Sequence, residues 1–241
     1  MLIYCLRRND AIHHAAQILQ SFGLPVTDTP DGSVSHLLLP VPSSSVFPEL
    51  QMLLSKLSTE VVISGGNLDA GFLKPYRTVD FLKDPFYLAY NAAITARCAQ
   101  TLAEEKSGEP LSGRPVLILG WGRIGKCLAR NLRADGADVT VAARKESDLA
   151  ILRALGYRAI PISQAELELN RYRFIFNTVP AMILPDIRLG SNCTAIELAS
   201  TPGMAGDGII PARGLPGKMA PEESGKLIAE TFIRLSLREE G

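Results

Sequence analysis

Three glycines at a fixed spacing, Gly120, Gly122 and Gly125, are the residues of this 241-residue chain with the clearest chemical meaning. They follow four apolar residues, 116–119, which are typical of a strand buried on both faces. The first glycine allows a tight turn, the second lets the backbone approach a diphosphate, and the third allows a helix to pack closely on the strand. The spacing therefore predicts a dinucleotide-binding site, and the alternative is an ordinary glycine-rich turn.

A helix is expected to begin directly after these glycines, because Ile124, Leu128 and Leu132 recur at helical spacing. The start of a helix offers unpaired N–H groups and the positive end of a dipole, both of which suit phosphates. We therefore expect the cofactor to contact the turn and the first helical residues, namely Gly120, Trp121, Gly122, Arg123, Ile124 and Gly125.

The next strand, Val139 to Ala142, bears on the type of nucleotide. NAD enzymes commonly place Asp or Glu at its end, about twenty residues past the glycines, whereas this chain has Ala143, Arg144 and Lys145. A guanidinium can hold a 2′-phosphate through paired, charge-assisted bonds. At roughly 1.5 to 3 kcal/mol per such bond, the preference for NADP should be about tenfold to a hundredfold. NADP is therefore the expected cofactor, with NAD possible; in the alternative interpretation, Arg144 is a solvated charge beside Glu146 and Asp148.

Two polar loops follow later apolar runs. The first, Asn177, Thr178, Val179 and Pro180, comes after Phe174 to Phe176, and the second, 199–202, comes after Thr194 to Leu198. Ligands of open α/β sheets bind outside the carboxyl ends of the strands, so residues 177–180 are added to the predicted cofactor site. Plain surface turns are the alternative for both loops.

The alternation of strands and helices predicts an α/β fold with two Rossmann-like lobes, each built on a parallel sheet. We expect an N-terminal lobe over residues 1–84, a long connector helix over 85–110, and an NADP-binding Rossmann domain over 111–217. A last helix, 221–238, should pack back on the first lobe, so that residues 218–241 complete it.

Local signals predict where several elements begin and end. Asp10 should cap the first helix, a helix opening with proline should cover 48–57, and Asp84 with Pro85 should start the connector, which runs to Glu105. Ser163 should cap a small helix, and the glycine-rich segment 214–217 should be a loop.

The composition indicates which kinds of binding partner are disfavoured and which cellular compartment is expected. The 25 basic and 25 acidic residues cancel, which disfavours binding to nucleic acid or to an anionic membrane surface. The four cysteines are far apart and form no C-x-x-C motif, so no metal site and no disulfide framework are expected. The apolar start is too short for a signal peptide, and no run has membrane-spanning length. We expect a cytoplasmic protein.

The order of motifs resembles that of the bacterial dipicolinate synthase family, in its A subunits. The resemblance runs from residue 39 to the last helix and is carried by segments 39–42, 91–96, 116–123, 139–144, 176–181, 214–218 and 220–221. The most specific are Asn177 to Ala181, reading Asn-Thr-Val-Pro-Ala, and Gly214 to Pro221.

This resemblance implies a two-lobed, Rossmann-like oxidoreductase, similar in plan to 2-hydroxy-acid dehydrogenases and to adenosylhomocysteinase. It implies NADP-dependent oxidation of dihydrodipicolinate to dipicolinate, a reaction at a CH-CH or C-N bond of a dihydropyridine. It also implies a second, flavoprotein subunit as partner and a role in sporulation. A homodimer is a further expectation.

A dicarboxylate substrate needs groups that hold its two carboxylates, whereas aromatisation supplies much of the driving force. Hydroxyls and N–H groups at strand ends suit carboxylates. We expect such groups at the end of a first-lobe strand, on the connector helix and in the matched C-terminal motif, namely Pro42, Ser43, Ser44, Asn91, Thr95 and Lys218. Arg7, Arg8 and Arg213 are further basic candidates. The catalytic residues are unknown, because no general base can be assigned.

Two other interpretations stay open. The chain could use the same cofactor and fold on another small carboxylated substrate. It could instead be a nucleotide-binding subunit without turnover of its own, which the missing base and nucleophile would suit.

Overall fold

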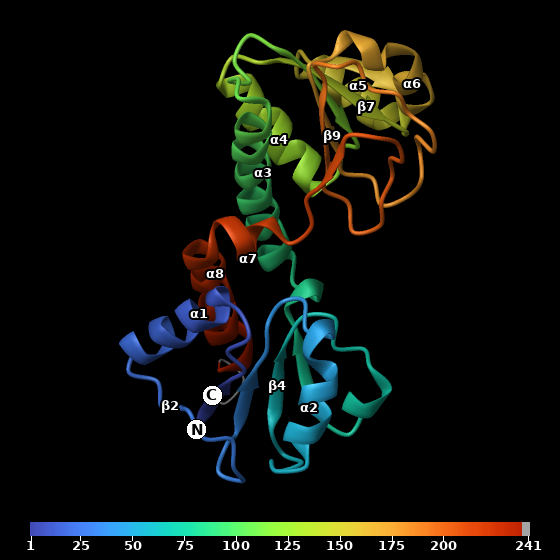
Figure 1. Cartoon of the computed structure of the whole chain (residues 1–241). Helices are drawn as coiled ribbons and strands as arrows, with labels where there is room; N and C mark the ends of the chain where they lie inside the picture. Colours follow the sequence, from blue (N-terminus) through green and yellow to red (C-terminus); the bar gives the residue numbers. More distant parts are fainter. Residues whose placement is uncertain (238–241) are drawn as a thin grey trace. The chain divides into compact units, whose positions relative to one another are not determined.

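The computed structural model describes residues 1–237, which divide into two compact units. Unit 1 contains residues 1–91 and the C-terminal segment from Pro216, and unit 2 contains residues 92–215. Each unit has its own parallel sheet with helices packed on it (Figure 1), so the predicted α/β class with two Rossmann-like lobes is confirmed. Residues 238–241, which include the predicted helix end at Arg238, lie outside the described part.

The sheet of unit 1 has five parallel strands in the order β2-β1-β3-β4-β5. Ile3 of β1 pairs with Val26 of β2 and with His36 of β3, so the direction of strand addition reverses between β1 and β3. The strands are β1 (Ile3–Cys5), β2 (Val26–Thr27), β3 (His36–Leu38), β4 (Val62–Gly65) and β5 (Arg77–Asp80).

The helices of unit 1 cover both faces of this sheet. Figure 1 shows α1 (blue) and α8 (red) together on one side and α2 on the other. A Cβ on Gly225 of α8 would lie 2.5 Å from the carbonyl oxygen of Ala11 in α1, so a glycine permits this close packing. The C-terminal helix therefore packs on the first lobe, as predicted. The helices are α1 (Asp10–Ser21), α2 (Phe47–Leu54), α7 (Leu215–Met219) and α8 (Pro221–Ser236), with 3₁₀ helices η1 (Ser44–Val46), η2 (Gly71–Leu73) and η3 (Phe81–Lys83).

The long connector helix is α3 (Pro85–Ser107). Its start is fixed by Asp84, whose Oδ2 accepts a hydrogen bond of 2.7 Å from the backbone N–H of Tyr87, as the capping signal predicts. Arg234 of α8 donates to both carboxylate oxygens of Asp84, one of them at 3.1 Å. The beginning of α3 is thereby tied to the C-terminal helix within unit 1.

The sheet of unit 2 has six parallel strands in the order β11-β10-β9-β6-β7-β8. The central strands β6 and β9 are almost wholly buried, which explains their continuous apolar sequences. The strands are β6 (Pro115–Leu119), β7 (Asp138–Ala143), β8 (Arg158–Pro161), β9 (Phe174–Asn177), β10 (Thr194–Glu197) and β11 (Ile209–Pro211). The helices are α4 (Arg123–Ala134), α5 (Glu146–Ala154) and α6 (Ala165–Glu168), with 3₁₀ helices η4 (Ile162–Gln164) and η5 (Leu169–Arg171).

Several local predictions were wrong. The cap of α1 is Asn9, whose side chain accepts from the N–H of Ile12, and Asp10 is already helical. The helix α2 ends at Leu54, three residues before the predicted end. Ser163 lies inside η4 and caps nothing, since no side-chain cap bond is present at η4 or α6. The segment predicted as a loop at 214–217 contains the start of α7, and the short strands β5 and β11 were not predicted.

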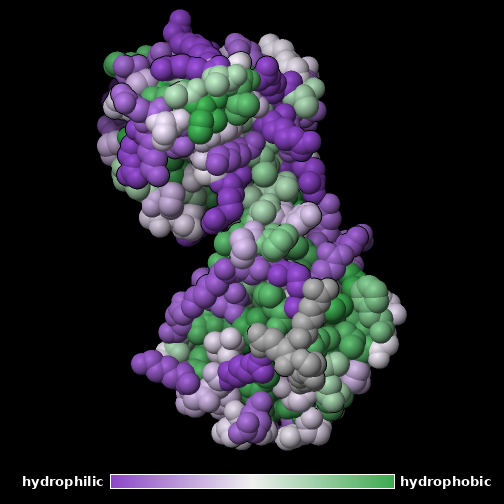
Figure 2. Space-filling model, turned by 180° about the vertical axis from the view of Figure 1, so that it is seen from behind, coloured by the Kyte–Doolittle hydropathy of each residue, from purple (hydrophilic) through white to green (hydrophobic). Residues whose placement is uncertain are grey.

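Hydrophilic and apolar residues are interspersed over the face shown in Figure 2. The large exposed apolar side chains include Phe22, Met52 and Leu167, which belong to different elements or loops. Within residues 1–237, no helix combines the length and apolar character needed to cross a membrane.

Candidate nucleotide-binding site

The three glycines lie at the carboxyl end of β6, where the strand order of unit 2 reverses. From β6 the chain adds β7 and β8 on one side, and then β9, β10 and β11 on the other. Thr178, directly after β9, donates its backbone N–H and its hydroxyl to the carbonyl oxygen of Leu119, both at 2.9 Å. The loop after β9 is thus attached to the turn after β6, at the position where open α/β sheets bind ligands.

Each glycine meets a different steric demand. Gly120 has a φ of 103°, in the left-handed region that favours glycine, and a Cβ there would lie 2.6 Å from Thr178 Oγ1. A Cβ on Gly125 would lie 2.3 Å from the carbonyl oxygen of Gly120, so helix and turn pack as the sequence predicts. At Gly122 the same Cβ would meet no atom within 4 Å. The space beside Gly122 is open, as a diphosphate requires.

The helix α4, which follows the glycines, has 12 residues and a start that can bind a phosphate. Gly122 is the N-cap of α4, and no side chain caps this helix, so its first N–H groups are not satisfied by a cap bond. Arg123, the first helical residue, is exposed, whereas Ile124 is half-buried. The turn and the start of α4 therefore fit an anionic group.

A buried carboxylate organises the two loops beside the glycines. Asn177 and Glu197 are paired in register at the ends of β9 and β10, and Asn177 Nδ2 donates to both carboxylate oxygens at 2.8 and 2.9 Å. Glu197 also accepts from the backbone N–H groups of Ala199, Gly203 and Met204 at 2.9 to 3.1 Å. One carboxylate thus shapes the loop after β10 and holds it to the loop after β9.

Glu197 was not among the residues predicted for the site, although a signal was present. It is a charged residue that ends the otherwise uncharged strand Thr-Ala-Ile-Glu, and it is only 4% exposed. A buried charge needs compensating hydrogen bonds, so its position already indicated a network. Asn177 has the same character: it is fully buried, and its Oδ1 accepts from the N–H of Val179.

Gly203 completes this network on steric grounds. A Cβ there would lie 2.5 Å from Asn177 Nδ2, 2.6 Å from the carbonyl oxygen of Val179 and 2.8 Å from that of Ala181. The loop after β10 can approach the loop after β9 only because residue 203 has no side chain.

The end of β7 carries the residues expected at the ribose. Ala143 is buried, whereas Arg144 and Lys145 are exposed. Neither makes an ion pair or a hydrogen bond with another side chain of residues 1–237. Both cations are therefore available to an anionic ligand.

Trp121 lies half-buried between two of the glycines. Its ring is 6.0 Å from that of Tyr157, and the ammonium of Lys126 lies 5.8 Å from the indole centroid. The only tryptophan of the chain is thus held beside the candidate site and can report on it.

In unit 1, the residues expected at the substrate differ in accessibility. Ser43 is fully buried, and its hydroxyl donates to the carbonyl oxygen of Pro40 at 2.7 Å and accepts from the N–H of Gly66 at 3.0 Å. Pro42, which follows a cis peptide bond, and Ser44 are exposed. The Ser43 hydroxyl therefore joins two strand ends, whereas Ser44 faces solvent.

The remaining candidates lie on helices. Asn91 and Thr95 are one turn apart on α3; Asn91 is half-buried, Thr95 is buried, and neither residue is without a partner. Lys218 is exposed on α7.

All three histidines belong to unit 1, and His36 is buried with its ring edge-to-face against Phe232.

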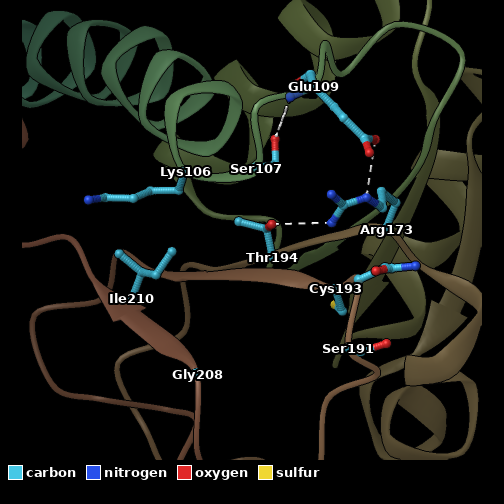
Figure 3. A pocket seen from close by; sticks show the side chains of 10 residues that line it. Lys106, Ser107, Glu109, Arg173, Ser191, Cys193, Thr194, Gly208 and Ile210 are labelled. Atoms are coloured by element: carbon cyan, nitrogen blue, oxygen red, sulfur yellow. Dashed lines mark hydrogen bonds and ion pairs between the residues drawn. The ribbon is translucent and has the colours of Figure 1, made fainter.

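A cleft of about 460 Å³ lies at the opposite, amino edge of unit 2's sheet (Figure 3). Its most buried cation, Arg173, donates at 3.3 Å to Glu109 and to Thr194, so that guanidinium is already engaged. Since ligands of such sheets bind at the carboxyl edge, we do not assign the nucleotide to this cleft. Its lining consists of Lys106, Ser107, Glu109, Arg173, Ser191, Asn192, Cys193, Thr194, Gly208 and Ile210.

The thiols of Cys5 and Cys193 are not activated. Burial raises the pKa of the Cys193 thiol to about 11 and that of Cys5 to about 12, so both are protonated at neutral pH. Residues 1–237 contain no group of three or more His, Cys, Asp or Glu side chains that could hold a metal ion.

Comparisons of the sequence and of the fold with known proteins point to the same relatives. No protein-family model matches the chain. The sequence is 31% identical over 157 residues to the A subunit of dipicolinate synthase from Bacillus subtilis (strain 168); the match spans 61% of this chain and 53% of that relative, about half its length.

Solved structures share the fold over nearly the whole chain. The crystal structure of the dipicolinate synthase A subunit from Bacillus halodurans has a TM-score of 0.78 at 23% identity and covers 97% of each chain. The transhydrogenase from Sinorhizobium meliloti has a TM-score of 0.76 at 12% identity, with 99% of this chain and 94% of that chain covered. The chain is thus similar in sequence and in fold to the A subunit of dipicolinate synthase, and the resemblance predicted from its motifs is confirmed.

Proposed function

We propose that this chain is an NADP-dependent oxidoreductase of the dipicolinate synthase type, oxidising dihydrodipicolinate to dipicolinate. The observation that carries the cofactor part is the open space at Gly122, at the start of α4 and at the reversal of strand order. The substrate part rests on the 31% identity with the A subunit of dipicolinate synthase.

The cofactor would lie on the turn and the loops already described. The backbone of Gly120, Trp121, Gly122 and the first residues of α4 would hold the diphosphate, and Arg144 with Lys145 would pair with the 2′-phosphate. Thr178, Val179 and Pro180 would line the site from the loop after β9. Asn177 acts differently in this proposal: because its side chain is buried and bonded to Glu197, it holds the loop in place.

The reaction balances without a strong base. The dihydropyridine loses two electrons and a proton as hydride to NADP⁺, and it releases one further proton as the ring becomes aromatic. The nicotinamide supplies the hydride acceptor. The protein has mainly to orient the ring and to bind its carboxylates. Pro42, Ser44, Asn91, Thr95 and Lys218 remain the proposed substrate residues, with Ser43 bracing the loop.

The proposal is tested by supplying NADP⁺ and dihydrodipicolinate to the purified protein, with and without the flavoprotein partner of dipicolinate synthase. We expect the absorbance of NADPH to appear together with dipicolinate in equal amounts. Reduction of NADP⁺ by another carboxylated compound, but not by dihydrodipicolinate, would instead support a different substrate.

One observation favours a second candidate, a nucleotide-binding subunit without its own turnover. Unit 2 contains no histidine, and burial raises the pKa of two of its three thiols, those of Cys127 and Cys193. Tight NADPH binding without activity, even when the flavoprotein partner is present, would select this candidate.

A further inference from the structure

An arginine and a glutamate meet at the reversal of strand order in unit 1. Arg8 follows β1, and Glu49 lies in the first turn of α2, which follows β3. Arg8 Nε donates to Glu49 Oε2 at 2.7 Å, and Arg8 Nη2 donates to Oε1. The planar guanidinium fork thus holds a carboxylate through two parallel bonds.

The ion pair between Arg8 and Glu49 lies at the position where sheets of this kind bind ligands. With the order β2-β1-β3-β4-β5, the reversal falls between β1 and β3. Ligands of such sheets bind at the carboxyl ends of these two strands. The same rule that places a nucleotide at Gly122 in unit 2 therefore places a ligand near Arg8 in unit 1.

Further charged groups surround the same strand ends. Arg7 pairs with Asp28, which follows β2, at 2.7 Å. Tyr4 of β1 is half-buried, and its burial together with the nearby Glu49 carboxylate raises the pKa of its phenol. Two adjacent arginines at one edge of the sheet are therefore each paired with a carboxylate.

The ion pair between Arg8 and Glu49 is exposed enough for another carboxylate to replace Glu49 on Arg8. The Arg8 side chain is 58% exposed and that of Glu49 is 32% exposed, and ion pairs accessible to water contribute little to stability. The Arg8 hydrogen bond holds the pKa of the Glu49 carboxyl below its usual range, so Glu49 is charged at neutral pH and competes with other carboxylates. A carboxylate ligand that also gains other contacts would displace it at small cost.

We propose that Arg8 binds one carboxylate of the substrate, and that Glu49 occupies the Arg8 guanidinium until the substrate arrives. This inference rests on the proposed function and adds to it the residue that recognises the carboxylate. Arginine suits this task better than lysine, because its fork matches both oxygens of a carboxylate.

The test measures the binding of two dicarboxylates by isothermal titration calorimetry. Dipicolinate is the expected product, and glutarate separates its carboxylates by the same number of atoms but lacks the ring. The variants are Arg8→Gln, Arg8→Lys and Glu49→Gln, with Lys56→Gln as a control that removes an exposed cation of unit 1. NADPH binding, followed by Trp121 fluorescence, is measured in parallel.

Arg8→Gln should raise the dissociation constant of dipicolinate at least tenfold, and Arg8→Lys should raise it less. Glu49→Gln should lower it several-fold, because the competing charge is gone. Lys56→Gln should change nothing, and all variants should bind NADPH like the wild type.

Unchanged dipicolinate binding in Arg8→Gln overturns the inference and leaves the proposed function standing. If dipicolinate does not bind but glutarate binds in an Arg8-dependent manner, the carboxylate site is supported and the pyridine substrate is wrong. If neither dicarboxylate binds to the wild type, the inference is overturned.

Discussion

Asn177 and Glu197 end two neighbouring strands of unit 2, and the Asn177 amide donates to both oxygens of the Glu197 carboxylate, at 2.8 and 2.9 Å. Three backbone N–H groups of the loop after β10 bind the same carboxylate. The contact thus fixes two loops beside the candidate site, although neither side chain is exposed to a ligand.

Glu197→Gln should weaken both the fold and nucleotide binding. The new amide nitrogen would face N–H donors, and two unsatisfied buried donors cost roughly 2 to 6 kcal/mol. Chemical denaturation measures the loss of stability, and titration with NADPH measures the loss of affinity. Glu197→Asp keeps the charge and should be milder. A glutamine variant as stable as the wild type would contradict the importance of this carboxylate.

Gly122→Ala and Gly125→Ala both add one methyl group, but the first should lower NADPH affinity and the second should lower stability. At Gly122 the methyl enters open space, so we expect normal stability but a large loss of NADPH affinity, because the methyl occupies the room needed by the diphosphate. At Gly125 it would lie 2.3 Å from a carbonyl oxygen, so we expect the unit to be destabilised. Thermal unfolding with and without NADPH distinguishes the two. Normal NADPH binding by Gly122→Ala would argue against the site.

Gly203→Ala should displace the loop after β10, because the methyl would lie within 2.8 Å of three atoms at the end of β9 and in the loop after it. We expect weaker NADPH binding and a lower melting temperature. Gly190→Ala is the matched control, since its methyl meets no atom within 4 Å. Equal behaviour of the two variants would show that the close approach of the loops is unimportant.

Asp84→Asn should destabilise unit 1 by about 1 to 3 kcal/mol, because it removes the ion pair with Arg234 while asparagine still caps α3. Hydrogen bonds from Arg234 lower the pKa of the Asp84 carboxyl. Its contribution is therefore fully present above the unfolded-state pKa of about 3.9, and it is lost as the pH falls through the lower folded-state value.

Urea unfolding of wild type and Asp84→Asn between pH 7 and pH 2 measures this dependence. The difference in stability should be constant at neutral pH and should shrink below about pH 4. A difference that does not depend on pH would contradict the ion pair.

Much of the fold could be predicted because its signals are local. The apolar run before Gly120, the spacing of the three glycines, and Asp84 with Pro85 each encode one strand, turn or cap within a few residues. The strands β5 and β11 were missed because both are short edge strands: Arg77–Asp80 has no apolar run, and Ile209–Pro211 has only three residues. Asp10 was preferred over Asn9 as a cap, although both residue types can fill that position.

The candidate site was predicted less completely, because its network joins residues distant in sequence. Asn177 was expected to contact the cofactor, but its partner Glu197 lies twenty residues away, and only the pairing of β9 with β10 brings them together. The same holds for Ser43, whose hydroxyl binds Gly66 of another strand end.

The most direct measurement of the central claim is the binding of NADPH and NADH to wild type and to Arg144→Gln, followed by Trp121 fluorescence, with Arg153→Gln as a control for an exposed charge in the same unit. Wild type should bind NADPH about tenfold to a hundredfold more tightly than NADH. Arg144→Gln should lose this preference without a lower affinity for NADH. Arg153→Gln should keep the preference for NADPH. No fluorescence change with either nucleotide, confirmed by calorimetry, would contradict the assignment of this site.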